Sequence, residues 1–167
     1  MSNRPSLLRD RRFVPMFFTQ FLGALNDNVY KQALLLVITY GLMSQHTAQV
    51  STLNNLAALL FILPYFIFSA TAGQIADKYE RAQLVRYLKV AEIAIMLIAT
   101  FGFLIGNLWL LLLALFLMGT QSTFFGPIKY AILPEVLKPN ELMSGNALFQ
   151  SGTSIAILLG MILGGAV

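Results

Sequence analysis

Five apolar segments, each long enough to cross a lipid bilayer, constrain this chain more than any other feature of its sequence. They run over residues 13–40, 53–76, 85–105, 108–130 and 142–167. A helix needs about 20 apolar residues to cross the hydrocarbon core, where backbone groups can hydrogen-bond only to one another. A transmembrane barrel would instead show alternating hydrophobicity over segments of about ten residues, and no such alternation is visible. The sequence therefore predicts an all-α, polytopic membrane protein with five transmembrane helices.

The composition agrees with a lipid environment. Hydrophobic residues make up 57% of the 167 residues and charged residues 11%, whereas charged residues form about 25% of a typical soluble domain. The excess apolar surface is therefore expected to face hydrocarbon. The chain has no cysteine, which excludes a disulfide framework, a thiolate metal site and a cysteine nucleophile.

Lysine and arginine residues gather in alternate connections between the segments. They lie before the first segment and in or beside two later connections, as Arg4, Arg9, Arg11, Arg12, Lys78, Arg81, Arg86, Lys89, Lys129 and Lys138. The connections at 41–52 and 106–107 contain none. The positive-inside rule then predicts a cytoplasmic basic N-terminus over residues 1–12, followed by the transmembrane bundle over residues 13–167. The net charge of +4 thus indicates anionic lipid headgroups as neighbours, and not nucleic acid.

The fifth segment ends in the apolar stretch "LLGMILGGAV", with no loop or tail after it. Five is also an odd number of helices for a bundle. We therefore expect the chain to be a fragment, with partner helices beyond Val167. The alternative is a small protein that oligomerises.

Charged residues occur in the middle of the first apolar segment. Asp27 and Lys31 are four residues apart, so they share one helix face, which Gln20 continues as a polar stripe. A charge at mid-membrane is costly and usually faces a polar cavity or a partner. Asp27, with Asn28 and Lys31 beside it, is therefore the first candidate for a substrate or ion site. The alternative is an internal ion pair, or a Lys31 side chain that reaches to the interface.

The later segments add three candidates for the same kind of site. Glu92 lies two turns into the third segment, where it faces a cavity or pairs with Lys89. Lys129 lies near the cytoplasmic end of the fourth, where it meets a substrate or reaches towards an anionic headgroup. Gln150 is the middle of a polar stripe formed with Asn146 and Ser154. Four small residues spaced by four, Gly152, Ala156, Gly160 and Gly164, predict a ridge for close helix packing.

No pattern in the sequence indicates catalysis. The lone histidine, His46, lies in a connection, and there is no metal-ligand cluster, phosphate-binding glycine loop or nucleophile–base arrangement. We therefore expect no metal and no cofactor. Polar stripes inside a helical bundle indicate a path for a solute.

The connection between the second and third segments, "GQIADKYERAQLVR" at residues 73–86, carries a glycine, an aspartate four residues on, and basic residues. It resembles the signature loop of the major facilitator superfamily, with Lys78 in place of an arginine and two further departures. The resemblance implies a conformational latch formed by Gly73, Asp77, Lys78 and Arg81. Gly73 would allow another helix to approach closely. Asp77 would pair with Arg81 and lie at the N-terminus of the next helix.

Two further stretches, "QFLGALNDNVYK" and "FFGPIKYAILPE", are similar to the lysophospholipid transporter branch of that superfamily, including forms fused to a glycerophospholipid acyltransferase. The resemblance implies the first five helices of a twelve-helix fold in the bacterial inner membrane. It implies a lysophospholipid substrate and an acyltransferase, fused or separate, that re-acylates it. Asp27 and Asn28 would line the cavity, while Lys129 would meet an anionic headgroup or take part in gating.

Two other classes of function remain open. A different major facilitator carrier, for a drug or a small polar solute, would share the fold and the loop. A helical assembly protein would transport nothing. Acyltransferase activity would need sequence beyond Val167, because Ser51 stands where a histidine–aspartate motif starting at His46 would need its aspartate.

Overall fold

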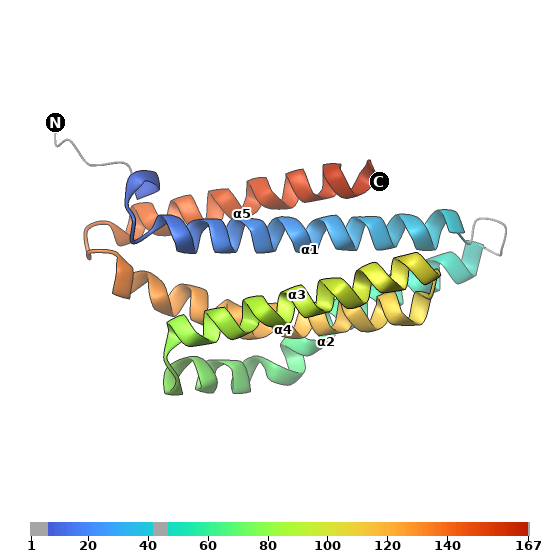
Figure 1. The fold of residues 1–167 in the computed structure, drawn as a ribbon, viewed down its shortest axis with the longest axis horizontal. Coiled ribbons are helices and arrows are strands. Elements are labelled where there is room, and N and C mark those ends of the chain that lie inside the picture. Colours follow the sequence, from blue (N-terminus) through green and yellow to red (C-terminus); the bar gives the residue numbers. More distant parts are fainter. Residues whose placement is uncertain (1–6, 42–46, 167) are drawn as a thin grey trace. The chain divides into compact units, whose positions relative to one another are not determined.

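The computed structural model describes residues 7–41 and 47–166. A short 3-10 helix, Leu7–Arg9, is followed by five long helices: α1 Val14–Gly41, α2 Thr47–Lys78, α3 Arg81–Ile105, α4 Leu108–Val136 and α5 Leu142–Gly165 (Figure 1). The prediction of an all-α fold is confirmed. The predicted boundaries at 53 and 130 were too narrow, because α2 already begins at Thr47 and α4 continues to Val136.

Four of these helices are long and apolar enough to cross a membrane, judged by length and composition: Gln49–Lys78 of α2, and all of α3, α4 and α5. The first helix is of similar length, with 28 residues, but its apolar sequence is interrupted by the polar run from Asn26 to Asn28 and by Lys31. Large apolar side chains remain exposed on several helices, including Phe66, Leu104 and Trp109. The chain is thus a multi-pass membrane protein.

The helices form two compact units. Unit one consists of Met1–Gln32 with Lys129–Val167, and unit two consists of Ala33–Ile128. The helices α1 and α4 each contribute to both units.

In unit one, α1 and α5 run parallel and in close contact (Figure 1). A Cβ added to Gly160 would lie 2.7 Å from the carbonyl oxygen of Leu25, and one added to Gly164 would lie 2.5 Å from that of Val29. Only glycine allows backbones to approach so closely. The predicted small-residue ridge on α5 is confirmed, since all four of its residues are buried.

Aromatic rings join the same two helices near the start of α1. The ring of Phe149 on α5 lies edge-on to those of Phe13 and Phe17, with centroids 6.0 and 6.5 Å apart. Just before α1, the Arg12 side chain donates two hydrogen bonds to the carboxylate of Asp10. These bonds lower the pKa of Asp10 to about 2, so its carboxylate stays ionised at a lower pH than an ordinary aspartate.

In unit two, α3 and α4 form an antiparallel hairpin. Gly106 ends α3 with a left-handed φ of 64°, which favours glycine, and its neighbour Asn107 accepts a hydrogen bond from the Leu110 amide at 3.1 Å. The two-residue connection between α3 and α4 is thus a tight turn. In α2, Pro64 lies inside the helix, and α2 bends near its middle in Figure 1, as expected for an interior proline.

A second glycine brings α2 and α4 together. A Cβ on Gly119 of α4 would lie 2.4 Å from the carbonyl oxygen of Phe61 on α2. Further along the same two helices, the rings of Phe68 and Phe124 lie 6.0 Å apart. These two contacts follow each other in the same order along both helices, so α2 and α4 are parallel.

Candidate functional site

Within unit one, the first candidate site contains one carboxylate and two ammonium groups. Asp27 and Lys31 lie one turn apart on α1, and Lys129 comes from α4. The carboxylate of Asp27 acts electrostatically on the ammonium groups of both lysines. All three side chains are half-buried. We call these residues the Asp27 cluster. With one carboxylate and two ammonium groups, its formal charge is positive. A positive cluster suits an anionic ligand group such as phosphate.

The polar residues next to Asp27 have different surroundings. Nδ2 of Asn28 donates to the Ala24 carbonyl oxygen of the same helix at 2.7 Å, and its Cβ faces Gly160 of α5. Nδ2 of Asn26 is buried and donates to no described residue. A buried donor without an acceptor costs free energy, which a bound ligand oxygen would recover.

The rest of the polar stripe on α1 serves helix packing. Gln20 is 6% exposed, and its Nε2 donates to the Thr153 hydroxyl of α5 at 3.0 Å. Thr153 had not been predicted as a partner. Thr153 lies in a mostly polar run over 150–154 of α5, and nothing in that run distinguishes it from its neighbours.

The structure does not bring Gln150 to the Asp27 cluster. Gln150 is exposed, together with Asn146 and Ser154, because this stripe is roughly opposite the buried ridge that contacts α1. The Ser154 hydroxyl donates to the carbonyl oxygen of Gln150 at 3.1 Å. In the described chain, the polar stripe of α5 therefore faces away from α1.

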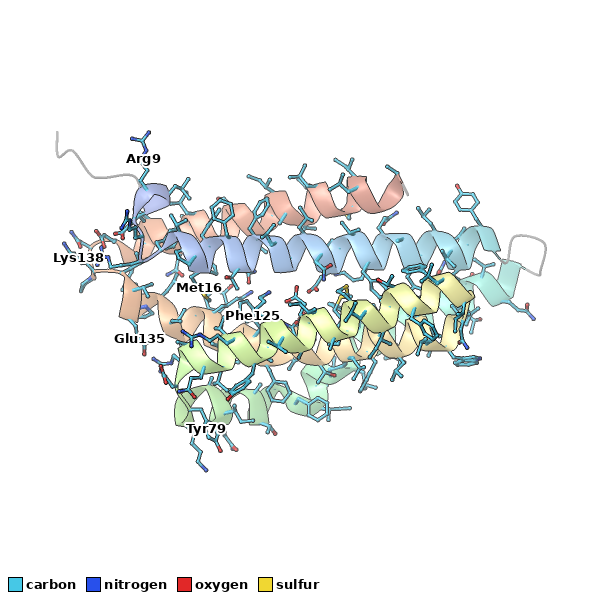
Figure 2. All side chains as sticks on the ribbon, viewed as in Figure 1. Arg9, Met16, Tyr79, Phe125, Glu135 and Lys138 are labelled. Atoms are coloured by element: carbon cyan, nitrogen blue, oxygen red, sulfur yellow. The ribbon has the colours of Figure 1, made fainter. Side chains whose placement is uncertain are left out.

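Within unit two, Glu92 is held in a second polar cluster. Nζ of Lys89 lies 2.5 Å from Oε2 of Glu92, and Nε2 of Gln121 on α4 donates to the same oxygen at 3.3 Å. The Lys89 ammonium also lies 5.0 Å from the ring centroid of Phe125, which Figure 2 labels on α4. We call these four residues the Glu92 cluster. The predicted alternative, that Glu92 pairs with Lys89, is confirmed.

Gln121 and Phe125 were not among the residues predicted from the sequence. Both are buried, at 6% and 7% exposed. Gln121 is the only amide side chain of α4 and lies in the short polar run from Thr120 to Thr123, which interrupts its apolar sequence; this interruption is the signal that would have found it.

The α2–α3 connection differs from the expected arrangement of a latch. Asp77 lies in the last turn of α2, and Glu80 is the residue that caps the start of α3, so the predicted position of Asp77 at the N-terminus of α3 was wrong. The reason is that α2 continues as far as Lys78. A Cβ on Gly73 would meet nothing within 4 Å, so no described residue makes the predicted close approach.

The charged residues of this connection lie at its surface. Asp77 and Lys78 are exposed and Arg81 is half-buried. Nζ of Lys78 lies 5.6 Å from the ring centroid of Tyr79, which Figure 2 labels at this connection. His46 and Arg4 lie outside the described residues. Among the described residues, no group of three His, Cys, Asp or Glu side chains could hold a metal ion.

Comparison with known proteins identifies the family to which the sequence is similar. The family model described as Major Facilitator Superfamily matches residues 16–167. A lysophospholipid transporter LplT of Serratia proteamaculans is 28% identical over 160 residues, which cover 96% of this chain and 37% of that protein. The namesake from Pectobacterium carotovorum is 29% identical over 161 residues, and the one from Yersinia enterocolitica 26% over 165.

The chain spans little more than a third of the length of these relatives, 36–37%. No solved structure matches the chain. The matched stretches cover 95–99% of this chain.

Proposed function

Since the chain belongs to the Major Facilitator Superfamily, we propose that the protein is a secondary transporter that moves lysophospholipid across the bacterial inner membrane by alternating access. In this mechanism, helix bundles rock around a binding site near the middle of the membrane. Three relatives that match at least 95% of this chain carry the name lysophospholipid transporter. That shared name supports the substrate.

The observation that carries the proposal is the Asp27 cluster. The carboxylate of Asp27 acts electrostatically on two ammonium groups in helices that otherwise consist mainly of apolar residues. A lysophospholipid headgroup always contains a phosphate, which Lys31 and Lys129 would bind. Asp27 would hold the two ammonium groups in place and accept a hydrogen bond from the substrate headgroup. The acyl chain would lie against the exposed apolar side chains.

The other predicted site residues take supporting roles in this proposal. Asn28 would stay bonded to its own helix in this conformation and turn to the cavity in another. Gln150 would line the path from α5 where further helices pack against its polar stripe. Such helices would come from the same protein or a second copy, because the stripe faces away from α1.

The orientation follows from the basic residues. We infer that the N-terminus is cytoplasmic and that the α2–α3 connection lies on the same side. Gly73, Asp77, Lys78 and Arg81 would then form a cytoplasmic latch that closes in one state of the transport cycle. Lysophospholipid delivered to this side would be the substrate of an acyltransferase, fused or separate.

A substrate panel tests the proposal against the other classes of function. The complete gene product would be expressed in a bacterial strain without its own lysophospholipid uptake, and uptake of a radiolabelled lysophospholipid, a cationic drug and a sugar would be compared. We expect uptake of the lysophospholipid alone. Transport of the drug or the sugar alone would assign a different carrier, and no transport of any probe would favour an assembly protein.

A further inference from the structure

The Glu92 cluster lies near the middle of α3. Glu92 follows the first residue of α3 by eleven positions in a helix of 25 residues, or about 16 Å along its axis. An ion pair at this depth is unfavourable unless its groups are well partnered. The pair is incompletely enclosed, since 27% of the Lys89 side chain and 12% of the Glu92 side chain are exposed.

The hydrogen bonds within the cluster are unevenly distributed. Both donors, Nζ of Lys89 and Nε2 of Gln121, bond to Oε2 of Glu92. Among the described residues, none donates to Oε1. The Lys89 ammonium has three hydrogens, and Glu92 is its one hydrogen-bond acceptor within the described chain. The face of Phe125 stabilises the same ammonium from another side.

The Lys89 ammonium and the Glu92 carboxylate thus lie side by side, and each has hydrogen-bonding capacity that no described residue uses. The remaining ammonium hydrogens suit an anionic oxygen of a ligand, and Oε1 suits a ligand donor within a few ångströms of that oxygen. A phosphodiester headgroup with an amino or hydroxyl group has this combination. A phosphate alone would satisfy only Lys89.

We propose that Lys89 and Glu92 form a second headgroup-binding site for lysophospholipid, in which Lys89 binds the phosphate and Glu92 Oε1 binds the terminal amino or hydroxyl group. Gln121 is a positioning residue, because its bond to Oε2 turns Oε1 towards the ligand. This inference rests on the proposed function and adds residues and a ligand geometry to it.

The test is equilibrium binding to the complete gene product in nanodiscs. The probes are lysophosphatidylethanolamine and lysophosphatidylglycerol, which share the phosphate but differ in the terminal group. We expect Lys89→Gln to weaken the binding of both lipids to this second site by about tenfold or more, as for loss of a charge-assisted hydrogen bond, and to leave binding at the Asp27 cluster unchanged. Glu92→Gln should weaken the ethanolamine lipid more than the glycerol lipid, since only the former has a charged donor.

Three controls separate a binding site from a structural ion pair. Arg86→Gln removes an exposed charge of α3 outside the cluster and should leave both affinities unchanged. The double variant Lys89→Glu with Glu92→Lys restores a pair of opposite charges. A purely structural pair would regain wild-type binding in this variant, whereas the proposal predicts that binding stays weak. Inorganic phosphate should not displace the lipid at equal concentration.

Several results would overturn the inference. Unchanged affinity of both single variants, or recovery of binding in the charge-exchanged variant, would show that the pair is structural only. Displacement by inorganic phosphate would show a phosphate site in place of a lipid site. If the wild type bound neither lipid, the proposed function itself would fail. The wild type is measured first, so this result is distinguished from a failure of the second site alone.

Discussion

At the scale of single residues, the chain places charges in its apolar helices in two different ways. Lys89 and Glu92 are matched in charge and bonded to each other at 2.5 Å. Asp27 acts electrostatically on two lysines, so this cluster holds two formal positive charges and one negative. A matched pair balances its own charge, while a cluster with more cationic than anionic groups suits an anionic ligand. The Asp27 cluster is therefore the better candidate for capturing an anionic substrate.

The bond between Gln20 and Thr153 gives a prediction at this scale. We expect Thr153→Val to leave the buried Gln20 amide without its acceptor, and to lower the stability of unit one by about 1 kcal/mol, since polar bonds between membrane helices are modest. The change would be measured as a lower midpoint of thermal unfolding in detergent. Thr153→Ser keeps the hydroxyl and should stay close to wild type. Equal loss in both variants would mean that packing, and not the hydrogen bond, sets the effect.

At the scale of helices, the close approach of α1 and α5 depends on glycine. A Cβ on Gly160 would lie 2.7 Å from a backbone oxygen and 2.8 Å from the Cβ of Asn28, so α1 and α5 would have to move apart. We expect Gly160→Ala to destabilise the protein by about 1–3 kcal/mol, as overpacking does. Gly165→Ala is the matched control, because a Cβ there meets nothing within 4 Å. Both variants would be compared by thermal unfolding, and equal stability would contradict the close approach.

Some sequence patterns predict the helices and their contacts better than others. Long apolar runs and the Gly106 turn identify the five helices well, because lipid leaves the backbone few alternatives. The small-residue ridge predicts which face of α5 meets another helix. The ends of α2 and α4 were missed because polar residues such as Thr47 and Glu135 can continue a helix beyond its apolar part.

The candidate site was harder to predict than the helices. Asp27 and Lys31 follow from their spacing alone. The hydrogen bond between Gln121 and Glu92 depends on which face of α4 turns towards α3. Apolar residues lie on every side of α4, so their helical periodicity does not identify that face. For the same reason, the polar stripe of Gln150 gave no indication that it would be exposed.

At the scale of the whole molecule, the basic residues predict an orientation that can be tested by labelling. The chain has no cysteine, so single cysteines can be introduced without background from it. Tyr79→Cys lies in the α2–α3 connection and Asn107→Cys in the next, with α3 between them. In intact cells with a permeable outer membrane, an impermeant maleimide should label position 107 only. Labelling of position 79 alone would reverse the orientation, and labelling of both would mean that α3 does not cross the membrane.

The most direct test of the central claim is transbilayer movement of a lysophospholipid in proteoliposomes that contain the purified complete gene product. A lipid with a fluorescent acyl chain would be added outside, and its protection from an external quencher followed over time. We predict protection with the wild type and none above protein-free vesicles with Asp27→Asn, which removes a charge but little volume. Equal protection in both would show that Asp27 is not part of the site. No protection with a correctly folded wild type would contradict lysophospholipid transport itself.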